Sequence, residues 1–261
     1  MALVISACGS STPSAADAGS LSPSAAALAV KSAVAGESSV QMVATEVQSG
    51  KTITQSVLVT RSARSESLSI GSGKGAGSAS ILILPHDAYL KATTSILTSI
   101  FGMPAADASH YAGHWLYFTP SSSGYKSLSS DVSSMSGISK QLDLSSVKKA
   151  SHPPIDGVKV VALAGKSTGT SGTLYLYVPA SGPALPVAGL VKEKGPDIHL
   201  TFSSWGKPAS ITAPPGAVAF TQPATAPATS GSTGSGSAGS GSAGSGSTGS
   251  TAPPSSTSAS S

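Results

Sequence analysis

Residues Leu174–Pro215 read LYLYVPASGPALPVAGLVKEKGPDIHLTFSSWGKPASITAPP, with three apolar runs separated by turns rich in glycine and proline. The runs are 174–179, 185–191 and 198–203. In the third run, Ile198, Leu200 and Phe202 alternate with polar residues. A period of two puts successive side chains on opposite faces of a strand, so one face is buried and the other meets water. Turns of this length between such runs are typical of a meander, and the stretch therefore predicts three antiparallel strands.

Similar short apolar runs recur upstream and predict further strands. They span 40–45, 52–60, 64–70, 79–84, 88–92, 113–118 and 158–164. Residues 25–35 instead have helical spacing, with Pro23 near the start and Gly36 as the stop. Helical spacing also covers 95–101, and a weaker, serine-rich helix pair covers 125–142. The sequence therefore predicts an α+β fold in which helices cover the apolar face of an antiparallel sheet.

The C-terminal stretch also carries motifs that resemble those of a known superfamily. Leu185-Pro186-Val187 enters a strand, Leu200–Pro208 (LTFSSWGKP) ends one, and Ile211–Pro215 (ITAPP) closes the domain. Gly113-His114-Trp115 resembles a Gly-x-Trp strand of the same group. From about Ser24 to Pro215 the chain thus resembles the LolA-like and LprG/LppX-like lipoprotein carriers. The resemblance implies a curved antiparallel half-barrel whose helices cover the concave face, and an interior that holds lipids or lipidated proteins.

Composition indicates which residues form the folded domain, and it argues against a nucleic-acid partner. Only 10% of the 261 residues are charged, and no charged side chain precedes Asp17 or follows Lys207. We expect one half-barrel domain over 23–220, a size at which a chain buries about 70% of its unfolded surface. Residues 221–261 are mostly Gly, Ser, Ala and Thr, and predict a disordered tail. The net charge of +4 is dispersed, whereas a nucleic-acid binder clusters its basic residues, so we expect no nucleic-acid partner.

The first residues predict a lipid anchor. Ile5-Ser6-Ala7-Cys8 resembles a bacterial lipobox, in which a cysteine thiol takes a diacylglycerol group and the chain is cut just before it. Residues 1–8 are then a short signal segment and 9–22 a flexible tether. Only seven residues precede Cys8, and none is basic, so a stray cysteine is the alternative. A lipidated Cys8 would hold the protein on the extracytoplasmic face of the cell membrane.

No motif in the sequence supports catalysis or a metal. Gly165-Lys166-Ser167 lacks the first glycine of a phosphate loop, because Val160 stands in its place. His110 and His114 are four residues apart, but no third ligand is evident. We therefore expect a non-enzymatic protein without metal or cofactor.

The apolar residues of the helical segments are the candidate lining of a lipid cavity. They are Ile96, Leu97, Ile100, Phe101, Trp115, Leu128, Val132, Met135, Ile138 and Leu142. These residues would line a space for acyl chains under the helices, or they would fill a solid core, and the sequence leaves both open. Two functions follow. One is an envelope lipoprotein that carries the acyl chains of a lipid, a lipoglycan or a lipidated partner. The other is an envelope lipoprotein with a filled core that serves as a binding or sensing module.

Overall fold

The computed structural model describes residues 17–73, 75–129, 134–167 and 171–220. The helices in this part are α1 (Pro23–Gly36), α2 (Thr94–Ser99), α3 (Ala105–Tyr111), α4 (Ser123–Ser129) and α5 (Met135–Gln141). The first strands are β1 (Ser39–Gln48), β2 (Lys51–Thr60), β3 (Arg64–Ile70), β4 (Gly77–Ile83), β5 (Ala88–Ala92) and β6 (Leu116–Phe118). The later strands are β7 (Leu144–Ser151), β8 (Val160–Ser167), β9 (Thr173–Pro179), β10 (Ala188–Lys192), β11 (Ile198–Ser203) and β12 (Val218–Ala219).

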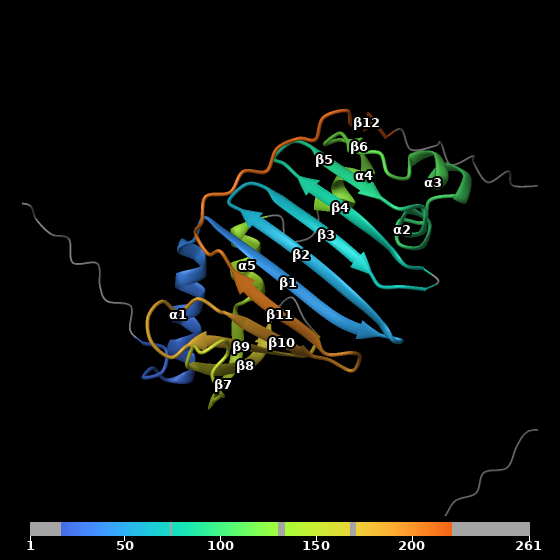
Figure 1. Cartoon of the computed structure of the whole chain (residues 1–261). Helices are drawn as coiled ribbons and strands as arrows, with labels where there is room; N and C mark the ends of the chain where they lie inside the picture. The colour runs from blue at the N-terminus through green and yellow to red at the C-terminus, as the bar shows by residue number, and fades with distance from the viewer. Residues whose placement is uncertain (1–16, 74, 130–133, 168–170, 221–261) are drawn as a thin grey trace, which may run out of the picture. The chain divides into compact units, whose positions relative to one another are not determined.

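These strands form one open, curved, 12-stranded sheet (Figure 1). The strand order is β12-β6-β5-β4-β3-β2-β1-β11-β10-β9-β8-β7. Every neighbouring pair is antiparallel except β12 with β6. Helices α1, α2, α4 and α5 pack on one face, which we call the inner face. The predicted α+β class, a curved antiparallel half-barrel covered by helices, is confirmed.

The sheet consists of two meanders joined side by side. One runs from β1 to β6 and the other from β7 to β11, and the pairing of β1 with β11 connects them. In that pairing Met42 lies opposite Phe202, and Ala44 lies opposite Leu200. The three strands predicted from the C-terminal stretch are β9, β10 and β11, so that prediction is confirmed.

The inner face carries two separate apolar clusters. The α1 cluster lies under α1 and α5, and its fully buried members include Val30, Val34, Val40, Val59, Ile138, Leu163, Leu176 and Val178. The α2 cluster lies at the other end of the sheet under α2 and α4, and includes Ile81, Ile83, Leu90, Ile96, Leu97, Leu116, Phe118 and Leu128. Helix α1 begins where Pro23 follows Ser22, whose hydroxyl accepts a hydrogen bond from the Ala25 N–H at 3.3 Å.

The edge strand β7 was not predicted. Its sequence, LSSVKKAS, has few apolar residues, and its pairing with β8 is interrupted between Ser145 and Lys148. Ser146 has a φ of 55°, so the alternation of faces breaks within the strand. The side chain of Lys149 donates hydrogen bonds to the backbone oxygens of Gly19 and Leu21. A lysine inside an edge strand is thus satisfied by the segment that precedes α1.

Residues 17–22 differ from the flexible tether expected over 9–22. Ala18 is completely buried, and the Gly19 N–H donates to the Ala180 oxygen at 2.9 Å. The Asp17 carboxylate accepts from the Gly182 N–H at 3.0 Å. Small side chains let this segment lie flat against the end of β9, so it belongs to the domain. Cys8 and the rest of the predicted tether lie outside the described residues.

Two further elements were absent from the prediction. Helix α3 follows α2, and Gly113, with a φ of 76°, turns the chain so that the strand expected from 113 begins only at Leu116. Strand β12 pairs with β6, where the Val218 N–H donates to the Trp115 oxygen at 2.8 Å. The ring of Phe220 then lies 5.1 Å from that of Phe118. The predicted tail, 221–261, lies outside the described residues, and no helix within them is long and apolar enough to cross a membrane.

Candidate functional site

The predicted cavity residues fall into two groups rather than one. Ile96, Leu97 and Leu128 belong to the α2 cluster, and Met135, Ile138 and Leu142 belong to the α1 cluster. Ile100 and Phe101 lie at the surface, with exposed fractions of 51% and 37%, because α2 ends at Ser99. Trp115 is half-buried, and Val132 lies outside the described residues. The helix residues therefore pack against the two ends of the inner face.

Between the clusters, the inner face presents a strip of apolar side chains that are only half-buried. We call it the interior strip. Its members are Met42, Ala44, Ile53, Leu68, Ile70 and Leu200. The strip spans four strands, with Ala44 opposite Leu200 on β11 and Ile53 opposite Ile70 on β3, and Gln55 lies between Ala44 and Leu68. The alternation of apolar and polar residues predicts which face of the sheet these side chains occupy. How much of each side chain stays exposed depends on where the helices pack, and the sequence does not predict those positions.

Polar side chains interrupt the inner face at the strip, and three of them, Gln55, Arg64 and Glu66, contact one another. Glu66 lies 3.5 Å from Arg64, and the exposed fractions of these side chains are 10% and 6%. The Gln55 amide donates to Glu66 at 2.7 Å. Arg64 also donates to the Leu128 oxygen at 3.0 Å and so ties α4 to the sheet. Burying a charged side chain without a partner raises the free energy of the folded state. These contacts reduce that cost and hold the three side chains in place.

The helices over the inner face are short and weakly capped. Helix α2 has six residues and α5 has seven, and neither receives a side-chain hydrogen bond at its N-cap. A helix of this length is not stable by itself, so α2 and α5 depend on their contacts with the sheet. Elements held by few contacts open at a lower free energy than the core strands.

Two tyrosine phenols near the β5–β6 end of the sheet have raised pKa values. Burial, followed by the nearby Asp87 charge, raises the pKa of the Tyr89 phenol. The pKa of Tyr117 is raised mainly by its hydrogen bond to Asp87, at 2.9 Å. A phenol is already neutral near pH 7, and both shifts raise its pKa further above that pH. Within the described residues, no group of three His, Cys, Asp or Glu side chains is placed to hold a metal ion.

The comparisons with known proteins give structural neighbours at low sequence identity. No family model matches the chain, and no curated protein matches it. The structure of LprF from Mycobacterium bovis matches with a TM-score of 0.47 and 14% identity over 74% of this chain and 96% of that chain. The lipoprotein LppX from Mycobacterium tuberculosis matches with a TM-score of 0.43 and 13% identity over 73% and 98%.

We predict that the buried ion pair matters more for stability than the exposed one. Arg64→Met removes one partner of a buried pair and strands the Glu66 charge, which costs about 3–5 kcal/mol in the free energy of unfolding. Lys31 pairs with Asp143 at 2.5 Å with side chains 46% and 43% exposed, so Lys31→Met costs about 1 kcal/mol or less. Urea unfolding followed by circular dichroism measures both values. Equal losses in the two variants would contradict this assignment.

Proposed function

We propose that the protein is a cell-envelope lipoprotein that binds the acyl chains of a lipid or a lipidated partner on the inner face of its sheet. The observation that carries this proposal is the division of the core. A domain normally has one contiguous apolar core, but here two clusters are separated by the half-buried interior strip. When a ligand covers apolar side chains that are still in contact with water, the free energy of the complex falls.

An acyl chain matches the chemistry of the strip. The strip offers methyl and methylene groups, and the Gln55 amide beside it donates to Glu66. Each methylene that a ligand buries contributes about 0.8 kcal/mol, so a long saturated chain gains affinity without directional contacts. The short helices α2 and α5 supply a cover that is able to move aside for entry.

A filled core in a binding or sensing module is the second candidate. It is favoured by the complete burial of Ile96 and Leu97 and by the 1% exposure of Ile138. The sequence predicted these residues as cavity lining. In the structure, Ile96 and Leu97 pack inside the α2 cluster and Ile138 packs inside the α1 cluster. In this alternative the interior takes no ligand, and the function depends on the outer surface.

Anchoring through Cys8 is the second part of the proposal. A diacylglycerol on the thiol would add two acyl chains, and two chains are needed for stable attachment because one chain binds a membrane only marginally. The segment that leads into α1 is packed on the domain from Asp17 onward, as the buried Ala18 shows. The anchor would therefore connect to the domain through the residues between Cys8 and Asp17, which lie outside the described part.

We predict that filling the interior strip prevents lipid binding and leaves the fold intact. Ala44→Trp places an indole on the strip, whereas Val43→Trp places the same group on the opposite face of β1. Native mass spectrometry of gently purified protein, supplemented with palmitic acid, measures bound acyl chains. We expect wild type and Val43→Trp to carry lipid, and Ala44→Trp to lose most of it with a change in stability below about 1 kcal/mol.

Two results would count against acyl-chain binding. If wild-type protein holds no acyl chain, the interior is not a lipid site. If Ala44→Trp instead lowers stability by about 1–3 kcal/mol, the indole has overpacked a solid core. Either outcome would leave the filled-core module as the function.

We predict that Cys8→Ser releases the protein from the membrane. In a bacterial host that processes lipoproteins, wild type should fractionate with the membrane and Cys8→Ser with the soluble proteins. The serine hydroxyl cannot form the thioether, so the acyl chains are absent from the variant. Wild-type protein in the soluble fraction would contradict the anchor, and it would not affect the proposal for the inner face.

A further inference from the structure

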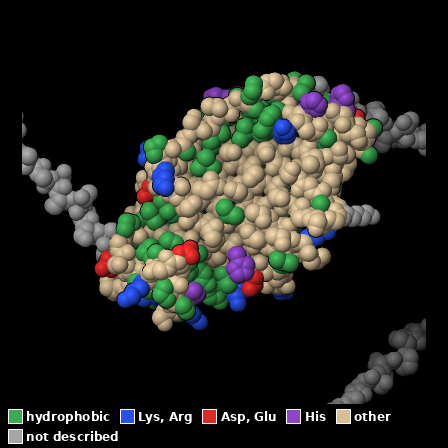
Figure 2. Space-filling model, viewed as in Figure 1, with side chains coloured by type: hydrophobic (Ala, Val, Ile, Leu, Met, Phe, Trp, Pro, Cys, Tyr) green, Lys and Arg blue, Asp and Glu red, His purple; other side chains and the backbone are tan. Residues whose placement is uncertain are grey.

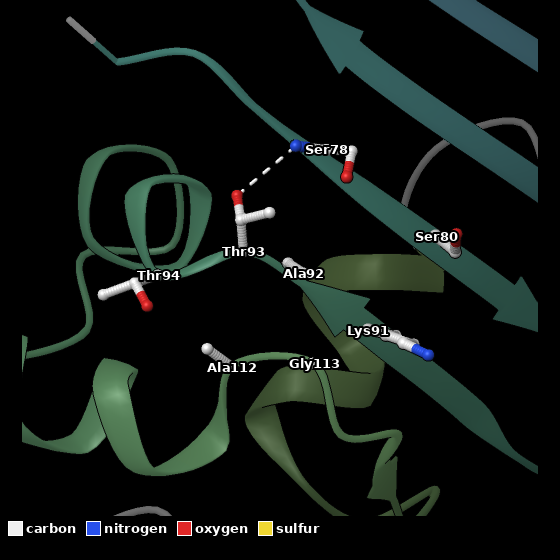
Figure 3. A pocket seen from close by; sticks show the side chains of 8 residues that line it. All are labelled: Ser78, Ser80, Lys91, Ala92, Thr93, Thr94, Ala112 and Gly113. Atoms are coloured by element: carbon white, nitrogen blue, oxygen red, sulfur yellow. Dashed lines mark hydrogen bonds between the residues drawn. The ribbon is translucent and has the colours of Figure 1, made fainter.

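A pocket opens on the outer face of the sheet, where β5 leads into α2 (Figure 3). Its volume is about 370 Å³. Its lining residues are Ser78, Ser80, Lys91, Ala92, Thr93, Thr94, Ala112 and Gly113. On β4, Ser78 and Ser80 alternate with Ala79 and Ile81, which are buried in the α2 cluster. The pocket thus lies on the opposite side of the sheet from the interior strip.

The backbone holds the pocket in a fixed form. The Ser78 N–H donates to the Thr93 hydroxyl oxygen at 3.3 Å, and the Thr93 N–H donates to the Ser78 oxygen at 3.0 Å. The Gly113 N–H donates to the Ala92 oxygen at 3.0 Å and fixes the rim formed by the α3–β6 connection. A Cβ on Gly77 would lie 2.3 Å from the Thr93 hydroxyl oxygen, so glycine is required for this close approach. The lining is therefore set by hydrogen bonds and sterics before any ligand arrives.

The lining favours an anion that also carries hydroxyl groups. Four of the lining side chains are serine or threonine hydroxyls, Lys91 is a cation, and none is a carboxylate. Among the described residues, Lys91 has no carboxylate oxygen within 4.0 Å. An ammonium group donates hydrogen bonds and accepts none, and hydroxyls both donate and accept. Ala112 is half-buried and adds apolar lining, whereas the Ala92 side chain is buried in the α2 cluster.

The outer face around the pocket carries little competing charge. Figure 2 views the sheet from this side and shows few charged side chains over the strands. Ser67 on β3 lies opposite Ser80, and Ser69 lies opposite Ser78, so hydroxyls continue from the pocket across the sheet. The Lys91 ammonium group would bind the negative charge of a ligand. The surrounding hydroxyls would form hydrogen bonds with the rest of that ligand.

We propose that this pocket binds a phosphate ester of a small polyol, with the phosphate at Lys91 and the polyol hydroxyls at the serine and threonine side chains. The pocket volume lies at the lower end of the range of about 300–1,000 Å³ that is typical of ligand sites, which suits a ligand of this size. A soluble glycerol phosphate and the headgroup of phosphatidylglycerol share this chemistry. The inference does not depend on acyl-chain binding, because it uses the other face of the sheet.

The test compares Lys91→Gln with Lys148→Gln in full-length protein that also carries Cys8→Ser, so that no lipid anchor attaches it to vesicles. Lys148 is an exposed lysine on β7, at the opposite edge of the sheet, so its variant makes the same change in net charge. Isothermal titration calorimetry with sn-glycerol 3-phosphate at low ionic strength measures the soluble ligand. Flotation with vesicles of phosphatidylglycerol in phosphatidylcholine measures the headgroup. Ser80→Ala removes one hydroxyl, and circular dichroism melting confirms that each variant is folded.

We expect Lys91→Gln to weaken binding about tenfold or more, since it removes a hydrogen bond between charged groups. Lys148→Gln should stay within about twofold of wild type, as is usual for an exposed charge far from a site. Binding of glycerol phosphate that depends on Lys91 supports the proposal with a soluble ligand. Dependence on Lys91 only with vesicles supports it with a lipid headgroup. The proposal is overturned if neither probe binds, or if Lys91→Gln and Lys148→Gln weaken binding equally.

Discussion

The pairing of β1 with β11 is the interaction on which the rest of the fold depends. It joins residues more than 150 positions apart, with Met42 opposite Phe202 and Thr45 opposite His199. Without it the two meanders would be separate sheets, each with an exposed edge. With it, the α1 and α2 clusters lie on one continuous inner face, and the interior strip connects them. Such a non-local pairing has a high loop-closure cost, which the burial of both clusters must offset.

The same continuity explains why the two faces of the sheet have different chemistry. On β4, the inward positions Ala79, Ile81 and Ile83 are buried, whereas the outward positions Ser78 and Ser80 line the pocket. A curved sheet covered by helices on one side needs apolar residues only on that side. The outer positions are then free to carry hydroxyls and a lysine. The sheet thus carries the apolar interior strip on its inner face and a pocket lined by hydroxyl side chains on its outer face.

Much of the fold could be predicted from the sequence, because alternation is a local signal. Ile198, Leu200 and Phe202 predict β11 and its buried face, and Pro23 and Gly36 predict the limits of α1. The partner of β11 could not be predicted, because its pairing with β1 depends on the whole chain. Strand β7 was missed since its pattern is broken by the irregular pairing after Ser145.

The candidate site was harder to predict than the fold. Sequence reasoning placed the cavity lining on helix residues such as Ile96 and Ile138, and the structure packs both of them fully into the clusters. The half-buried positions are instead on strands, as at Ile53 and Leu68, because exposure depends on where the short helices lie. The pocket around Lys91 had no sequence signal, since serine and threonine are common throughout this chain.

Methyl NMR with a spin-labelled fatty acid tests acyl-chain binding on the interior strip most directly. Isoleucine methyl groups report from the strip at Ile53 and Ile70, and from the two clusters at Ile96 and Ile138. Addition of a doxyl-labelled stearic acid should broaden the Ile53 and Ile70 signals strongly and affect Ile96 and Ile138 much less. Unchanged signals at Ile53 and Ile70, or equal broadening at all four residues, would contradict a lipid site on the strip.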